Sequence, residues 1–144
     1  MEWKDFDKGV FLVNCLGIIY NPKTKKVLIG RRENDPYIKK LTWCFPGGRP
    51  EYGEELDDSL VRAIKEKTNL KIKNPKIIFA KTYPEKKEFM AIYFICNTFK
   101  GNIKASNGLV ELKWVDAKDL EKYFTTSFHP KLKKYLLELT KNDR

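Results

Sequence analysis

The residues best suited to chemistry lie within residues 43–70, where two carboxylates and an arginine share one charged segment. These are Glu54, Arg62 and Glu66. Carboxylate oxygens are the ligands that hard divalent cations take in proteins, so the segment is a candidate metal site. A structural role is the alternative. Asp58, Arg62 and Glu66 are spaced four apart with alternating sign, and on a helix they would form ion pairs that each contribute a few tenths of a kcal/mol.

A helix is predicted to position these charges, following a turn at Pro46-Gly47-Gly48. Its apolar face is predicted from residues that recur every fourth position, Leu56, Leu60 and Ile64. Asn69 follows the last turn and suits the left-handed conformation that ends many helices. The first turn is expected to carry acidic residues, which suit the positive end of the helix dipole: Glu54, Glu55, Asp57 and Asp58.

The rest of the chain predicts strands before and after this helix, and helices at the end. Strands are expected at residues 11–20, 26–30, 76–83, 88–99 and 111–115, with the first two joined by a turn at 21–23. Helices are expected at residues 117–123 and 130–140, the last opening with proline. This order predicts an α+β fold, an α/β/α sandwich with a mixed central sheet, formed by one domain over residues 1–144.

Residues 43–70 resemble a Nudix box, the motif of the Nudix hydrolase superfamily. The matching positions, in register, are Gly48, Glu54, Arg62, Ile64, Glu66 and Leu70. Residues 27–32 and 111–115 also resemble segments of that family, in the right order along the chain. The chain departs from the box at Ala63, Lys67 and Asn69. Two of the three helix carboxylates that hold metal in the family are therefore absent, and one has become a cation.

The resemblance implies hydrolysis of a nucleoside diphosphate linked to another group, assisted by Mg²⁺ or Mn²⁺. It assigns metal binding to Glu66, Glu111 and the Gly48 carbonyl, and it places Glu54, Arg62, Glu66 and Glu111 in the catalytic set. The structural alternatives are a helix-dipole charge for Glu54 and a solvated strand end for Glu111. Lys67 opposes a resident metal, since two unit charges about 4 Å apart interact by about 4 kcal/mol at an effective dielectric near 20. We therefore expect the metal to arrive with the substrate.

Arginine and aromatic residues near the box are candidate substrate contacts. Arg32 follows a strand, and its planar guanidinium suits a diphosphate, whereas Arg31 should point the other way if the strand alternation persists. Both are substrate-binding candidates, with a surface charge as the alternative. Phe45, Tyr20 and Tyr83 could stack on a base, although aromatic side chains in strands usually belong to the core.

A subset of the family gives a candidate base late in the chain. Residues 30–36, followed by Trp43, Phe45 and the glycine turn, are similar to the GDP-mannose mannosyl hydrolases, which carry a depleted box and use a late histidine as base. His129 lies in a comparable place, and its ordinary pKa near 6.5 suits general base catalysis. A loop residue at a helix start is the alternative.

The composition and net charge limit the classes of function that this chain can have. A chain of 144 residues has 29 basic and 19 acidic residues, a net charge of +10, which attracts polyanions at low salt. The lysines are scattered and do not interleave with aromatic residues in an RNA-binding pattern, so a nucleic-acid partner is disfavoured. Three cysteines without CxxC spacing and one histidine argue against structural zinc, and Cys15 and Cys96 are predicted to be buried thiols.

No apolar run is long enough to cross a membrane, and residues 1–5 lack the order of a secretory signal, so we expect a cytoplasmic protein. The expected partner is a small nucleotide substrate. The oligomeric state is open, and a homodimer is one state to test. Two functions follow: a Nudix-type hydrolase weakened by the loss of box carboxylates, or a Nudix-fold module that has lost its metal. In the second, Lys67 joins Arg32 as a substrate-binding residue, and the module holds a nucleotide or partner without turnover.

Overall fold

The computed structural model describes residues 10–36, 38 and 41–142. The N-terminal residues 1–5, judged above for a signal sequence, lie outside this part of the chain. None of the described helices is long and apolar enough to span a membrane.

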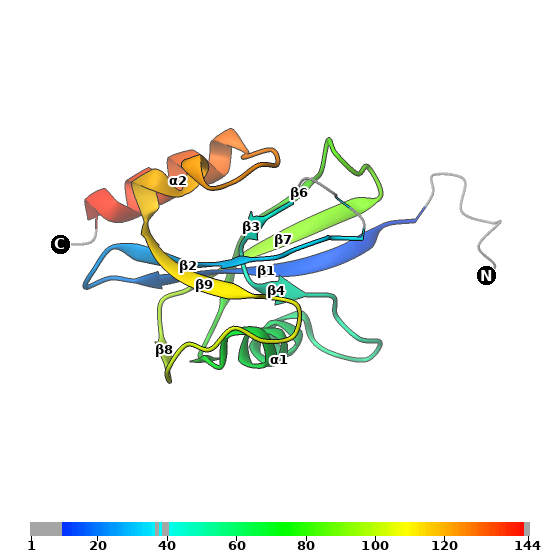
Figure 1. Cartoon of the computed structure of the whole chain (residues 1–144), viewed down its shortest axis with the longest axis horizontal. Coiled ribbons are helices and arrows are strands. Elements are labelled where there is room, and N and C mark those ends of the chain that lie inside the picture. The colour runs from blue at the N-terminus through cyan, green and yellow to red at the C-terminus, as the bar shows by residue number, and fades with distance from the viewer. Residues whose placement is uncertain (1–9, 37, 39–40, 143–144) are drawn as a thin grey trace.

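The centre of the protein is a seven-stranded mixed sheet (Figure 1). Its main path runs β3-β2-β1-β7-β6, while β4 pairs with β1 and β9 pairs with β2. The central strands β1 and β7 are parallel over eight residue pairs, and the other pairs are antiparallel. The strands are β1 (Leu12–Asn21), β2 (Lys26–Arg31), β3 (Trp43–Cys44), β4 (Gly47–Gly48), β6 (Lys76–Thr82), β7 (Phe89–Cys96) and β9 (Glu111–Asp116).

Helices cover both faces of this sheet, which confirms the predicted α/β/α sandwich. Helix α1 (Leu56–Thr68) lies on one face, and α2 (Pro130–Asn142) with the 3-10 helix η2 (Ala117–Lys122) lies on the other (Figure 1). A separate two-stranded sheet consists of β5 (Lys71–Ile72), which follows α1 in the chain, paired with β8 (Phe99–Lys100).

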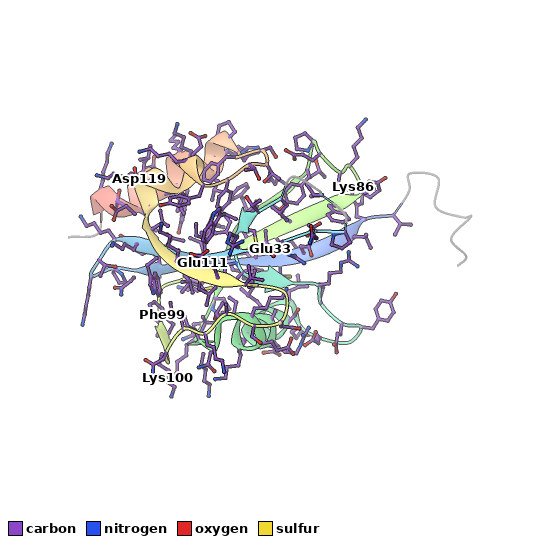
Figure 2. The ribbon with its side chains drawn as sticks, viewed as in Figure 1. Glu33, Lys86, Phe99, Lys100, Glu111 and Asp119 are labelled. Atoms are coloured by element: carbon purple, nitrogen blue, oxygen red, sulfur yellow. The ribbon has the colours of Figure 1, made fainter. Side chains whose placement is uncertain are left out.

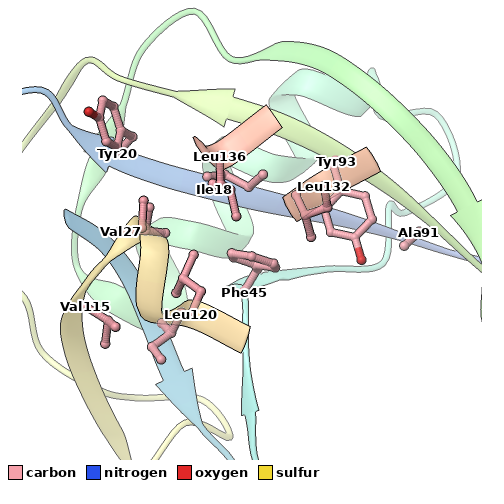
Figure 3. Close-up of a cluster of buried hydrophobic side chains, with 12 residues drawn as sticks. Ile18, Tyr20, Val27, Phe45, Ala91, Tyr93, Val115, Leu120, Leu132 and Leu136 are labelled. Carbon is pink, nitrogen blue, oxygen red and sulfur yellow. The ribbon is translucent and has the colours of Figure 1, made fainter. Parts of the chain in front are cut away.

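Strand alternation builds a separate core on each face of the sheet. In β1, Ile18 and Tyr20 point into the core beneath α2, while Cys15 and Ile19 point into the core above α1. Figure 3 shows the first core, where Leu132 and Leu136 of α2 pack over the sheet. On the other face Leu60 and Ile64 of α1 are fully buried, as their spacing predicts, and the thiols of Cys15 and Cys96 are buried and free.

Helix α1 is shorter at its start than the sequence predicts. Glu54 and Glu55 precede the helix, and only Asp57 and Asp58 lie in its first turn. The reason is a local turn, in which the Glu54 carboxylate accepts a hydrogen bond from the Glu51 amide at 2.8 Å. At the other end Asn69 takes the left-handed conformation, with φ 69°, as predicted.

Three short strands and one break were not predicted. β3, β4 and β5 have two residues each, too few for a periodic signal. The expected strand at 88–99 ends at Cys96, and Phe99 begins β8 in the second sheet, where it stacks on Trp114 with ring centroids 5.5 Å apart. The short helix expected at residues 117–123 is present as the 3-10 helix η2.

Strand β4 sets the position of the glycine turn against the sheet. Gly47 pairs with Leu16 of β1, and a Cβ at Gly47 would overlap the Cys15 carbonyl oxygen. Only glycine permits this approach. The turn is thereby held between β1 and α1, where the charged segment begins.

Candidate functional site

A pocket of about 280 Å³ opens beside the glycine turn. It lies where β1, the residues after β2, the end of α1 and the loop before β9 meet. Cations and apolar side chains share its walls. The described lining residues are Asn14, Leu16, Arg32, Asp35, Ile38, Leu41, Cys44, Phe45, Pro46, Gly47, Gly48, Arg49, Lys67, Tyr83, Phe89, Asn107, Gly108, Leu109 and Thr126.

Lys67 reaches this pocket from the last turn of α1. Its ammonium donates a hydrogen bond to the Gly47 carbonyl. A Cβ placed on Gly48 would lie 3.4 Å from the Lys67 Nζ and 3.3 Å from the Ala63 Cβ, so these two of the three departures from the box face the glycine turn. Burial, and then the positive charge of Arg32, lower the pKa of Lys67.

Arg32 lines the same pocket and is held by an acidic neighbour. Its Nε lies 3.5 Å from Oδ2 of Asp35, whose side chain is only 5% exposed. The other carboxylate oxygen of Asp35 accepts a hydrogen bond from the Ile38 amide at 2.8 Å. Asp35 therefore orients Arg32 and connects it to the Ile38 backbone.

Arg31 points away from the pocket, as strand alternation predicts. It donates hydrogen bonds of 2.8 Å to both Glu111, the first residue of β9, and Glu33, which follows β2; both are labelled in Figure 2. These two carboxylates raise the pKa of Arg31. Neither Arg31 nor Glu111 is among the described pocket residues. Their roles in substrate and metal binding therefore stay predictions.

Arg62 joins the segment before α1 to the helix. Two of its nitrogens donate to the Glu54 carboxylate at 2.9 Å, and a third lies 3.4 Å from Glu66. The same guanidinium donates to the Arg49 carbonyl at 3.3 Å. The guanidinium of Arg62 and the Glu51 amide lower the pKa of Glu54 to about 2. Glu54 is thus held in its ionised form by Arg62, and the catalytic roles of both residues stay predictions.

The residues present do not fit a resident divalent metal. The two box positions that face the glycine turn carry a methyl group at Ala63 and an ammonium at Lys67. Glu66 is engaged by Arg62 and accepts a 3.3 Å hydrogen bond from Asn107. Within the described part of the chain, no group of three His, Cys, Asp or Glu side chains is arranged to hold a metal ion. The metal ligand set of Glu66, Glu111 and the Gly48 carbonyl therefore remains a prediction, and the described side chains do not form a cluster that supports it.

The candidate stacking residues are mainly core residues. Phe45 is 3% exposed and packs edge-on against Phe124, with ring centroids 4.9 Å apart, yet one part of it reaches the pocket wall. Tyr20 is buried in the same core and does not appear among the lining residues described. Tyr83 lines the pocket, and burial raises its pKa to about 12. Tyr83 is therefore a neutral hydroxyl at neutral pH.

His129 lies at the start of α2. Its Nδ1 accepts a hydrogen bond from the Lys131 amide at 3.1 Å, and its ring packs on Phe79. These contacts correspond to the structural alternative, a residue that satisfies a free amide of the first helical turn. His129 is absent from the pocket lining as far as the structure describes it. The base role stays a prediction.

Several pocket residues were not predicted from the sequence. Asp35 and Asn107 lie in loops, where no periodic pattern marks them, and Asn107 has a left-handed backbone with φ 53°. Arg49 directly follows the glycine turn, and this proximity was a usable signal. Its guanidinium lies over the Phe89 ring, 5.8 Å from the centroid. Cys44 also lines the pocket, but burial raises the pKa of its thiol to about 11, so it is a protonated thiol at neutral pH.

The loop before β9 closes one wall of the pocket and completes α1. The Lys104 amide donates to the Thr68 carbonyl at 2.9 Å, and the Ser106 amide donates to the Lys67 carbonyl at 3.1 Å. These bonds satisfy carbonyls that the end of a helix leaves without intrahelical partners. Lys67 and the loop wall are thereby joined.

Known proteins share this fold and sequence pattern. Over 109 residues the chain is 34% identical to the 8-oxo-dGTP diphosphatase of Buchnera aphidicola subsp. Schizaphis graminum, a match covering 76% of this chain and 79% of that protein. It is 31% identical over 103 residues to the ADP-ribose pyrophosphatase of Methanocaldococcus jannaschii, covering 69% of this chain and 60% of that one. The match to an uncharacterized Nudix hydrolase of Bacillus subtilis spans 54% of that relative, so two of these relatives are much longer than the matched region.

Solved structures agree on the fold. The MutT protein from Methanosarcina mazei Go1 is similar with a TM-score of 0.73 at 20% identity, covering 95% of this chain and 98% of that one. The MutT protein described from Aliivibrio salmonicida and Vibrio cholerae is similar with a TM-score of 0.69 at 20% identity, covering 91% and 98%. Residues 11–137 match the NUDIX domain. Nudix hydrolases generally use divalent metals. This chain departs from the Nudix box at Ala63 and Lys67, and it belongs to the NUDIX domain family.

Proposed function

We propose that this pocket binds a nucleoside diphosphate joined to a second group, and that the protein hydrolyses the diphosphate linkage as a Nudix-type hydrolase. One observation carries the assignment of the ligand. Arg32, Arg49 and Lys67 meet at a single pocket whose other walls are largely apolar. Clustered cations suit a diphosphate, and apolar walls suit a base.

Each part of such a ligand has a matching group. The planar fork of Arg32, oriented by Asp35, suits two phosphate oxygens, and Lys67 supplies a compact charge beside the glycine turn. Leu16, Phe89 and Leu109 offer apolar surface for the base. A volume of about 280 Å³ holds part of a dinucleotide-sized ligand, so the second group would extend outward.

The relatives support hydrolysis as the reaction. Two of them, at 31% and 34% identity, are named ADP-ribose pyrophosphatase and 8-oxo-dGTP diphosphatase. Both names describe cleavage within a chain of phosphates. A cytoplasmic location is part of the same proposal.

Nucleotide binding without turnover is the second candidate. It is favoured by the ammonium of Lys67 and the methyl group of Ala63 at the positions that face the glycine turn. Without carboxylates there, the protein has fewer groups to activate water. The two candidates share the ligand and differ in the fate of the diphosphate.

One experiment separates them. ADP-ribose, GDP-mannose and 8-oxo-dGTP are incubated with the protein in Mg²⁺, in Mn²⁺ and in EDTA, and the products are resolved by chromatography while binding is measured by calorimetry. Turnover that falls in Glu66→Gln, with affinity retained, supports the hydrolase. Binding with no product under any condition assigns the second candidate, and the absence of binding by the whole panel contradicts both.

A further inference from the structure

The charge of the pocket is unusual for a site that would also hold a divalent cation. Its described lining has three positive side chains, Arg32, Arg49 and Lys67, and one negative side chain, Asp35. Three positive charges less one leave an excess of two. Like charges gathered in a partly buried site repel one another, and an anion relieves that repulsion.

Lys67 is held in place before any ligand arrives. The Gly47 carbonyl accepts one hydrogen bond from its ammonium, which has three N–H donors in all. Its stem packs in the half-buried end of α1, and its carbonyl is bound by the Ser106 amide. The ammonium is therefore a fixed charge at the glycine turn, and fixing a charge beforehand lowers the entropy cost of binding.

We infer that the Lys67 ammonium stands in for the divalent metal as the cation that receives the diphosphate, so that this pocket binds nucleoside diphosphates without divalent metal. This inference rests on the proposed function, because it concerns the same pocket and the same class of ligand. It assigns phosphate neutralisation to Lys67 with Arg32. It also accounts for Ala63, since a carboxylate at that position would face the same ammonium and compete with the ligand phosphates for it.

The test uses the full chain and ADP as the probe, with affinity measured by calorimetry in EDTA and again in MgCl₂. The wild-type protein is expected to bind ADP in EDTA at least as tightly as in MgCl₂. Lys67→Met keeps the length of the side chain and removes its charge, and it is expected to weaken binding in EDTA by about tenfold or more. Lys67→Arg should retain most of the affinity.

Lys65→Met is the matched control on the same helix. Lys65 is exposed, its ammonium binds the Asn69 carbonyl and side chain, and it does not line the pocket among the residues described. Its loss should leave the Kd unchanged. Thermal unfolding of each variant checks that the fold is intact, and Lys67→Gln replaces Lys67→Met if the latter does not fold.

A double change gives a second arm of the test. Ala63→Glu with Lys67→Glu places carboxylates at both positions that face the glycine turn, and glutamate is a good helix former. In EDTA this variant should lose ADP binding, and MgCl₂ should restore it. Metal dependence would thus be created by the change that removes the ammonium.

The outcomes separate the inference from the function on which it rests. Wild-type binding that appears only with MgCl₂, or Lys67→Met binding as tight as wild type in EDTA, overturns the inference and leaves the proposed function standing. Failure of the folded wild-type protein to bind ADP, ADP-ribose or GDP-mannose in either solution overturns both.

Discussion

At the scale of single residues, adjacent arginines have opposite surroundings. Arg32 lines the pocket beside Lys67, while Arg31 is held by Glu33 and Glu111 on the other side of the strand. The two arginines are a matched pair for mutagenesis, since their side chains have the same chemistry and point in different directions. Their substitution therefore tests the pocket without changing the type of residue removed.

Arg32→Ala is expected to weaken ADP binding by about tenfold or more, because hydrogen bonds to a charged group contribute about 1.5–3 kcal/mol and 1.4 kcal/mol corresponds to tenfold. Arg31→Ala should leave the Kd unchanged and lower stability slightly, since exposed ion pairs contribute less than about 1 kcal/mol each. Calorimetry measures the first effect and urea unfolding the second. Equal loss of affinity in both variants would contradict the placement of the ligand.

Much of this detail lies beyond the sequence. Strand alternation predicts that Arg31 and Arg32 diverge, and the structure confirms it. The ion pair of Arg32 with Asp35 depends on the path of an irregular loop, which no periodicity encodes. Similarly, the Lys67 ammonium could be predicted to oppose a metal, but its hydrogen bond to Gly47 required the position of β4, a strand of two residues.

At the scale of elements, α1 is defined at both ends by local chemistry. The Glu54–Arg62 pair connects the preceding turn to the helix, and Asn69 ends it. The C-terminal end and the buried face of this helix follow from the sequence, because they depend on a conformational preference of asparagine and on residue spacing. The start was misjudged by two residues, because the turn of Glu51 and Glu54 competes with the helix for the same backbone.

Glu54→Gln is expected to lower stability at pH 7, and the difference from wild type should shrink in acid. The pKa of Glu54 is lowered from 4.5 to about 2, so the folded state favours the ionised carboxylate. Its contribution is fully present above the ordinary pKa of 4.5 and is lost as the pH falls towards 2. Urea midpoints measured from pH 7 to pH 2 give this dependence. Glu55→Gln, at an exposed residue without a side-chain cap contact, is the control and should show no such trend.

At the scale of the whole molecule, the two-layered core determines the fold, whereas the surface charge affects only what the protein binds. Alternation in the strands and the four-residue spacing in α1 are enough to predict helices on both faces of a sheet. The order of strands in that sheet is set by long-range pairing, such as β1 with β7, and this was beyond the reach of local patterns. The net charge of +10 does not predict the fold, but it determines how strongly the protein attracts polyanions.

We expect single-stranded RNA to bind only weakly and non-specifically, with a Kd no tighter than about 1 μM at physiological salt. The lysines are dispersed along the sequence and do not interleave with aromatic residues in an RNA-binding pattern. Fluorescence anisotropy with labelled RNA at low and physiological salt measures this. Affinity that stays tight at physiological salt would show that the basic surface is a nucleic-acid site.

The loop before β9 has a kinetic consequence. The amides of Lys104 and Ser106 lie outside any helix or strand, yet both are bonded to carbonyls of the last turn of α1. They can exchange with solvent deuterium only when these hydrogen bonds break, that is, when the loop and the last turn of α1 separate. Their exchange should therefore be slow and should keep pace with the amides of α1, in contrast to the amide of Lys118 at the exposed surface of η2. The exchange rates of these two loop amides thus report the opening of the helix end that carries Lys67. A bound nucleotide should slow the exchange of both amides by the same factor.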